Sequence, residues 1–168
     1  MPLPSSTRTL RVCVWCFGRG VASAMQRHEW HANSSSATLT GRLVFDLGMN
    51  NGEDSLNYLR KGYSVMAVEA NQRFAHAMAR LRKPNLLIVN RAITEDGYGR
   101  QNVTFCLAGQ GGVSSHVKGT TNRCDTPIVV PTTTCAELVR KHGTPWLVKI
   151  DIEGKEGACI DSLLQLLA

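Results

Sequence analysis

The segment from residue 43 to residue 54 constrains the fold of this chain more than any other. It opens with three apolar residues, which predict a buried strand, and the strand ends at Asp46. Gly48 and Gly52 then bracket Asn50 in a turn, and a polar helix start follows. A strand that ends in a glycine turn and opens a helix is typical of α/β folds that hold adenosine-containing ligands.

The residue at position 46 helps to distinguish between such ligands. A dinucleotide-binding turn reads G-x-G-x-x-G, so that backbone N–H groups can approach a pyrophosphate at the helix N-terminus. Asp46 stands at the first glycine position here, and a carboxylate beside a phosphate is repulsive. The same carboxylate suits a ligand with a sulfonium and an ammonium group. The turn therefore favours S-adenosylmethionine over NAD.

From residue 41 onward, strands alternate with helices in the apolar pattern. The pattern predicts strands over 43–47, 64–69, 86–89 and 146–152, and helices over about 53–61, 72–83, 134–143 and 156–167. Apolar runs at 103–107 and 128–130 predict an antiparallel insert. This alternation means parallel strands with helices on both faces, so we expect a Rossmann-like, doubly wound, mostly parallel sheet.

The last predicted helix keeps an apolar face, and no further strand follows it. A crossover helix normally leads into another parallel strand, so we expect the domain to be truncated after its fourth core strand and that strand's helix. Strand 146–152 would then have an unpaired apolar edge, which is an aggregation liability.

The first forty residues differ from the rest of the chain. Residues 1–42 hold five Arg and one acid, and the Arg/Ser-rich character resembles an organelle transit peptide. A disordered tail is the alternative. The apolar run 12–17 is too short to span a bilayer, so no stable membrane insertion is expected. We expect a non-globular leader over 1–40, a domain over 41–168, and organelle targeting or otherwise a cytoplasmic location.

The charge distribution disfavours nucleic acid as a partner. The chain carries a net charge of +6, but residues 43–168 hold fourteen basic and twelve acidic groups. A nucleic-acid-binding domain should carry its basic excess on the folded part.

The six cysteines are scattered through apolar segments. Cys13-Val-Trp-Cys16 has no second C-x-x-C to complete a zinc site, and it does not open a helix after a strand. Buried reduced thiols are the expectation for the other four.

Glu69 ends the strand 64–69, 23 residues after Asp46. An acid at this place can accept hydrogen bonds from both ribose hydroxyls of an adenosine ligand. The alternative is a solvated carboxylate at a strand end. The segment 90–93 closes the third strand, and there Ala92 is a candidate for contact with the adenine.

Lys149, Asp151 and Glu153 alternate along strand 146–152 and therefore share one face. Asp151 and Glu153 approach the carboxyl end of the strand, where ligands bind in such sheets, so both are candidate site residues. A purely structural Lys149–Asp151 pair is the alternative. No further ligand cluster accompanies the two acids, so no metal is expected.

His116 lies in a Gly/Ser-rich stretch. It is a candidate general base for a hydroxyl acceptor. A lone loop histidine that is simply exposed is the alternative.

Three motifs together resemble the FkbM family of S-adenosylmethionine-dependent methyltransferases. They are Val44-Phe-Asp-Leu-Gly-x-Asn-x-Gly52, Val68-Glu-Ala-Asn71 and Val148-Lys-Ile-Asp-Ile-Glu-Gly154, and the resemblance covers about residues 41–157. The last motif is the most specific of the three.

The resemblance implies methyl transfer to a hydroxyl of a small molecule, such as a sugar or secondary metabolite. It also implies that Asp151 and Glu153 line the reaction side, and that the cofactor is held by Asp46, Gly48, Asn50, Gly52 and Glu69. Two alternatives stay open. One is a degenerate or truncated module that binds the cofactor without turnover, and the other is a nucleotide-dependent oxidoreductase.

Overall fold

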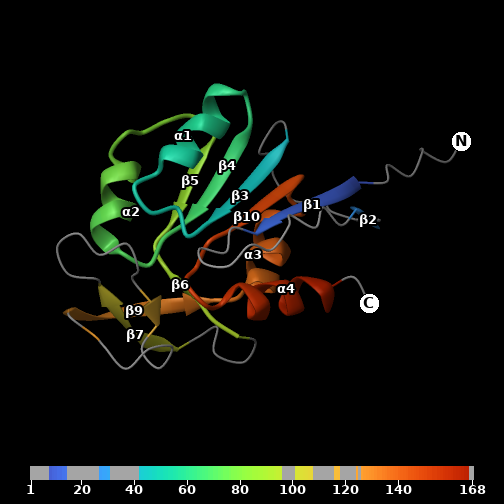
Figure 1. Ribbon diagram of the computed structural model, residues 1–168. Helices are drawn as coiled ribbons and strands as arrows, with labels where there is room; N and C mark the ends of the chain where they lie inside the picture. Colours follow the sequence, from blue (N-terminus) through green and yellow to red (C-terminus); the bar gives the residue numbers. More distant parts are fainter. Residues whose placement is uncertain are drawn as a thin grey trace, which may run out of the picture.

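The computed structural model describes residues 8–14, 27–30, 42–95, 101–107, 116–117, 124 and 126–166. Within these residues the largest element is a six-stranded sheet with the order β2-β1-β10-β3-β4-β5 (Figure 1). All neighbouring strands run parallel except β1 and β2. The strands are β1 (Arg8–Val14), β2 (Arg27–Trp30), β3 (Leu43–Leu47), β4 (Ser64–Val68), β5 (Leu86–Val89) and β10 (Leu147–Ile150).

Four helices accompany this sheet in the described part of the chain. They are α1 (Glu53–Arg60), α2 (Gln72–Ala79), α3 (Cys135–His142) and α4 (Glu156–Leu164). Figure 1 shows α1 and α2 on one side of the sheet and α3 and α4 on the other. The predicted α/β class, with a parallel sheet between helices, is therefore confirmed.

A second, four-stranded sheet has the order β6-β9-β7-β8. Its strands are β6 (Ala92–Ile93), β7 (Asn102–Leu107), β8 (His116–Val117) and β9 (Thr126–Thr133). The pairing of β7 with β9 is antiparallel, which confirms the predicted antiparallel insert.

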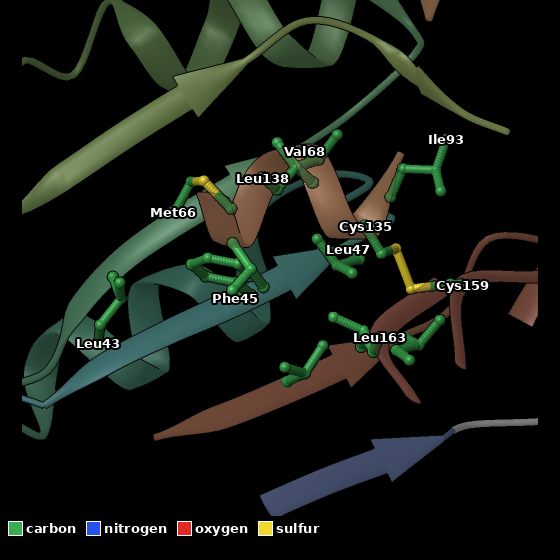
Figure 2. Packing of buried hydrophobic residues seen from close by; sticks show 13 residues of the cluster. Leu43, Phe45, Leu47, Met66, Val68, Ile93, Cys135, Leu138, Cys159 and Leu163 are labelled. Atoms are coloured by element: carbon green, nitrogen blue, oxygen red, sulfur yellow. A yellow bond between two sulfur atoms is a disulfide. The ribbon is translucent and has the colours of Figure 1, made fainter. Parts of the chain in front are cut away.

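Burial explains why the central strands read as continuous apolar runs. Every residue of β3 and β4 is buried, as is usual for strands covered on both faces. Alternate residues of these strands point into two different cores. Phe45 and Met66 pack on the side of α3 and α4, whereas Val65 and Ala67 pack on the side of α1 and α2. Figure 2 shows the first of these cores, in which Phe45 lies beside Met66 and Leu138. Full burial of a side chain such as Phe45 stabilises the fold by roughly 1.5–3 kcal/mol.

The strand order places a reversal at the centre of the sheet. The chain moves outward from β3 through β4 to β5, and then returns to the other side of β3 as β10. The segments that leave β3 and β10 therefore turn to opposite faces, which is the arrangement of a topological switch point. In open α/β sheets, ligands bind outside the carboxyl ends of the strands at such a point.

The expectation of an unpaired edge on the fourth core strand is wrong. Strand β10 lies between β3 and β1, and Val12 of β1 is in register with Val148 of β10. Residues 8–14 and 27–30 thus belong to the sheet, which contradicts a non-globular leader at those positions. For the other residues of the leader, which lie outside the described part, that expectation stays a prediction.

The expectation of four reduced thiols is also wrong. Cys106 is bonded to Cys124, and Cys135 to Cys159. The partners are 18 and 24 positions apart in the sequence.

Among the described residues, no helix is both long and apolar enough to cross a lipid bilayer.

A variant that lacks residues 1–41 tests the role of β1. We expect it to aggregate at concentrations where the full chain is monodisperse, because removal of β1 exposes the backbone edge of β10. Size-exclusion chromatography with light scattering measures this. Equal monodispersity of both proteins would contradict the pairing of β1 with β10.

Candidate functional site

The glycine turn after β3 is held between the ends of β4 and β10. Gly48, Asn50 and Gly52 all have positive φ, at 80°, 53° and 87°. The N–H of Gly48 donates to the Val68 carbonyl at 3.0 Å. A Cβ on Gly48 would lie 1.8 Å from the carbonyl oxygen of Asp151, so only glycine fits there.

The second glycine packs against helix α2. A Cβ on Gly52 would lie 2.3 Å from the sulfur of Met78. Gly52 also caps α1, whose first turn carries Glu53 and Asp54. Acidic side chains at a helix N-terminus are favourable to the helix dipole. They make the same place unfavourable for a phosphate, because the negative charges repel.

Glu69 follows β4 and ties the glycine turn to the next loop. Its side chain is buried, and its Oε2 and Oε1 accept from the N–H groups of Asn50 and Asn71, both at 2.7 Å. Burial raises the pKa of Glu69, and the two N–H donors oppose that rise without cancelling it. A carboxylate offers about four acceptor positions, so each oxygen can accept a further hydrogen bond from a hydroxyl.

The amide of Asn90 fixes the backbone beside Glu69. Its Nδ2 donates to the carbonyls of Glu69 at 2.8 Å and of Ala70 at 3.1 Å. The loop after β5 therefore supports the loop after β4, and both lie at the carboxyl edge of the sheet.

Lys149 is the cation at the centre of this edge. It is in register with Asp46 on the neighbouring strand, and its Nζ lies 3.1 Å from Asp46 Oδ1. Nζ also donates to the Gly48 carbonyl at 2.9 Å, and it lies 3.6 Å from Asp54 and 3.8 Å from Asp151. Burial alone would lower the pKa of Lys149, but Asp46 and the other carboxylates outweigh burial and raise it. Lys149 is therefore charged at neutral pH.

Asp46 lies beneath the glycine turn and is completely buried. Its Oδ2 accepts from the Ser55 hydroxyl at 2.6 Å, and its Oδ1 faces Lys149. Lys149 neutralises the Asp46 carboxylate, so the expected repulsion of a phosphate by a bare carboxylate at position 46 is wrong. Direct contact of Asp46 with a ligand stays a prediction.

Asp151 follows β10 directly and reaches the same cluster. Its N–H donates to the Leu47 carbonyl at 2.9 Å, and its side chain is 30 % exposed. Burial raises the pKa of Asp151; Lys149 lowers it and Glu156 raises it, with a net upward shift. The expected Lys149–Asp151 pair exists, but at 3.8 Å it is longer than the Lys149–Asp46 pair.

Glu156, which the sequence did not single out, organises the turn after Asp151. Its Oε1 accepts from Ile152 N–H at 3.1 Å and its Oε2 from Gly154 N–H at 3.0 Å. Glu153 lies within this turn with a φ of 53°. The structure thus brings Asp151 into the cluster. Strand β10 ends at Ile150, so the expectation that Glu153 shares a strand face with Lys149 is wrong: Glu153 lies in the turn that follows the strand.

The other two candidates lie toward the small sheet. Ala92 is buried in β6 and packs in a cluster with Ala70, the residue after Glu69. His116 lies in β8 opposite Cys106. Strand β8 is three strand spacings from β6, or roughly 14 Å. Strand pairing therefore does not bring His116 to the carboxyl edge, and its role as a base stays a prediction.

No group of three or more His, Cys, Asp or Glu residues suited to a metal ion occurs in the described ranges.

Comparison with known proteins gives no relative. No protein-family model matches the chain, and neither the curated proteins nor the solved structures contain a match.

Loss of the central cation should destabilise the fold. For Lys149→Met we expect a loss of about 3–5 kcal/mol in the free energy of unfolding, because Asp46 is left buried and charged without its partner. The double variant Asp46→Asn/Lys149→Met should recover part of the loss, and urea unfolding measures both. The control Lys155→Met breaks a partly exposed pair with Glu95 and should cost under about 1 kcal/mol. Additive losses at positions 46 and 149 would contradict the coupling.

The same pair predicts a dependence on alkaline pH. The folded pKa of Lys149 lies above its ordinary value of 10.5, so its contribution is fully present below pH 10.5 and is lost as pH rises through the folded pKa. The difference in unfolding free energy between wild type and Lys149→Met should therefore shrink at the alkaline end of a pH series. A difference that stays constant above pH 10.5 would show that the ammonium charge contributes nothing.

Proposed function

We propose that the chain is a Rossmann-like, S-adenosylmethionine-dependent methyltransferase domain that methylates a hydroxyl of a small molecule. The observation that supports this most is the position of Glu69. Its buried carboxylate spans the glycine turn and the loop after β4, at the carboxyl edge of a parallel sheet and beside the reversal of strand order. That is where an adenosine ribose would meet an acceptor for its hydroxyls.

The charges around the turn fit a cationic ligand better than a dinucleotide. Glu53 and Asp54 occupy the first turn of α1, where a dinucleotide fold would place its pyrophosphate. Asp54 is 58 % exposed and lies on this side of the turn, 3.6 Å from Lys149. An amino group or sulfonium would be attracted by this acid, whereas a pyrophosphate would be repelled. Asp54 would supply the negative charge that Asp46, neutralised by Lys149, does not present to a ligand.

Each residue of the edge has a proposed part in holding the cofactor. Glu69 would accept from the ribose, the turn Gly48–Gly52 would present its backbone, and Ala92 would border the adenine. Asp46 would contribute indirectly: it pairs with Lys149, which donates to the Gly48 carbonyl of the turn. The bound cofactor would supply an electrophilic methyl group on its sulfonium.

Asp151 is the proposed general base on the acceptor side. Its raised pKa makes it a stronger base than an ordinary aspartate, and its carboxylate is 30 % exposed. It would accept the proton of the acceptor hydroxyl, which contributes about 10²–10⁴-fold to such reactions. Orientation of the hydroxyl toward the methyl group would supply the larger part of the rate. Glu153 and His116 are secondary candidates for contact with the acceptor.

Substitution of Glu69 tests the cofactor site. We expect Glu69→Ala to weaken S-adenosylhomocysteine binding at least tenfold, because each charge-assisted hydrogen bond is worth about 1.5–3 kcal/mol. Calorimetric titration of the full chain measures the dissociation constant, with NAD as a ligand that should not bind.

Asp161→Ala is the matched control, since Asp161 is an exposed acid on α4. It should leave the dissociation constant unchanged. An unchanged constant in a folded Glu69→Ala variant would remove Glu69 from the site. Transfer of a labelled methyl group to pooled hydroxylated small molecules then separates an enzyme from a binding-only module.

A further inference from the structure

The disulfide Cys135–Cys159 lies at the junction of two helices behind the candidate site. Cys135 is the first residue of α3, and Cys159 lies one turn into α4. Both residues are buried in the core that α3 and α4 form with the sheet. Figure 2 shows the sulfur–sulfur bond among the apolar side chains of this core, near Leu47 and Leu163.

The bond acts on the part of α4 that shapes the site. Glu156 begins α4, and its carboxylate holds the N–H groups of Ile152 and Gly154 in the turn that follows Asp151. Cys159 is three residues after Glu156, and its own N–H donates to the Lys155 carbonyl. The disulfide therefore fixes the same helical turn that carries Glu156.

A weaker contact joins the helices beside the disulfide. The N–H of Ala136 donates to the Ser162 hydroxyl at 3.0 Å. This hydrogen bond and the apolar contacts of the core would keep α4 folded after reduction. They would not fix its first turn as a covalent bond does, because a single hydrogen bond opens readily.

We propose that the Cys135–Cys159 disulfide is a redox-dependent cross-link that orders the turn after Asp151. The oxidised protein is the form in which this turn is ordered. Closure removes two protons and two electrons from the Cys135 and Cys159 thiols. The electrons pass to a disulfide such as oxidised glutathione, which is reduced to two thiols. Such a protein reaches its ordered form in an oxidising compartment, where disulfides persist.

Hydrogen exchange tests this in the full chain without any ligand. The protein is equilibrated in glutathione buffers of graded redox poise, and alkylation with mass spectrometry reports the state of each cysteine. On reduction of Cys135–Cys159 we expect the amides of Ile152 and Gly154 to exchange at least tenfold faster. The Leu56 amide of α1, which donates to Gly52, should keep its rate.

Two double variants provide matched controls. Cys135→Ala/Cys159→Ala should reproduce the fast exchange in oxidising buffer. Cys106→Ala/Cys124→Ala removes the disulfide of the insert and should leave the amides of 152 and 154 protected. If the first variant does not fold, hydrogen exchange of the wild-type protein across the graded glutathione buffers still tests the proposal.

Three results would overturn the proposal. The first is free thiols at Cys135 and Cys159 in oxidising buffer. The second is an unchanged hydrogen-exchange rate of the Ile152 and Gly154 amides on reduction. The third is loss of protection throughout the chain, which would show that the disulfide stabilises the whole fold and not this turn in particular. Binding of S-adenosylhomocysteine should weaken at least fivefold on reduction, and this second measurement alone rests on the proposed function. An unchanged exchange rate on reduction would contradict the role of the disulfide, whereas absence of S-adenosylhomocysteine binding would contradict only the proposed function. The two failures can therefore be told apart.

Discussion

The ammonium group of Lys149 holds the carboxyl edge of the sheet together. It pairs with Asp46 at 3.1 Å, donates to the Gly48 carbonyl at 2.9 Å, and lies within 4 Å of Asp54 and Asp151. These groups come from β3, from the turn after it, from the start of α1 and from the end of β10. A buried charge costs several kcal/mol unless it is paired. The cluster is therefore stable only as a set, and this couples the shape of the turn to the register of β10 on β3.

The shape of the turn decides what the edge can bind. Lys149 donates to the Gly48 carbonyl and the Val68 carbonyl accepts from the Gly48 N–H, and two residues further on the N–H of Asn50 donates to Glu69. Glu69 in turn joins the loops after β3 and β4 while it keeps acceptor capacity for a ribose. The positive charge of Lys149 lies beneath the turn, whereas the carboxylate of Asp54, at the start of α1, is exposed. The proposed preference for a sulfonium ligand follows from this distribution.

Local patterns predicted the alternating strands and helices, because apolar periodicity depends on near neighbours in the chain. They could not predict contacts that depend on which strands become neighbours. The Lys149–Asp46 pair requires β10 to lie beside β3, and the role of β1 requires a distant segment to pair with β10. The Rossmann strand order places the fourth core strand beside the first, but the register that sets Lys149 opposite Asp46 does not follow from that order. Disulfide pairing cannot be read from a sequence, since six cysteines allow fifteen connectivities.

The central claim is that this edge holds an adenosyl ligand, and the most direct test is a crystal structure of the full chain with S-adenosylhomocysteine. We expect both ribose hydroxyls to lie within hydrogen-bonding distance of the Glu69 carboxylate, with the glycine turn unchanged and Lys149 still paired with Asp46. A ligand bound elsewhere, or a ribose turned away from Glu69, would contradict the proposed site.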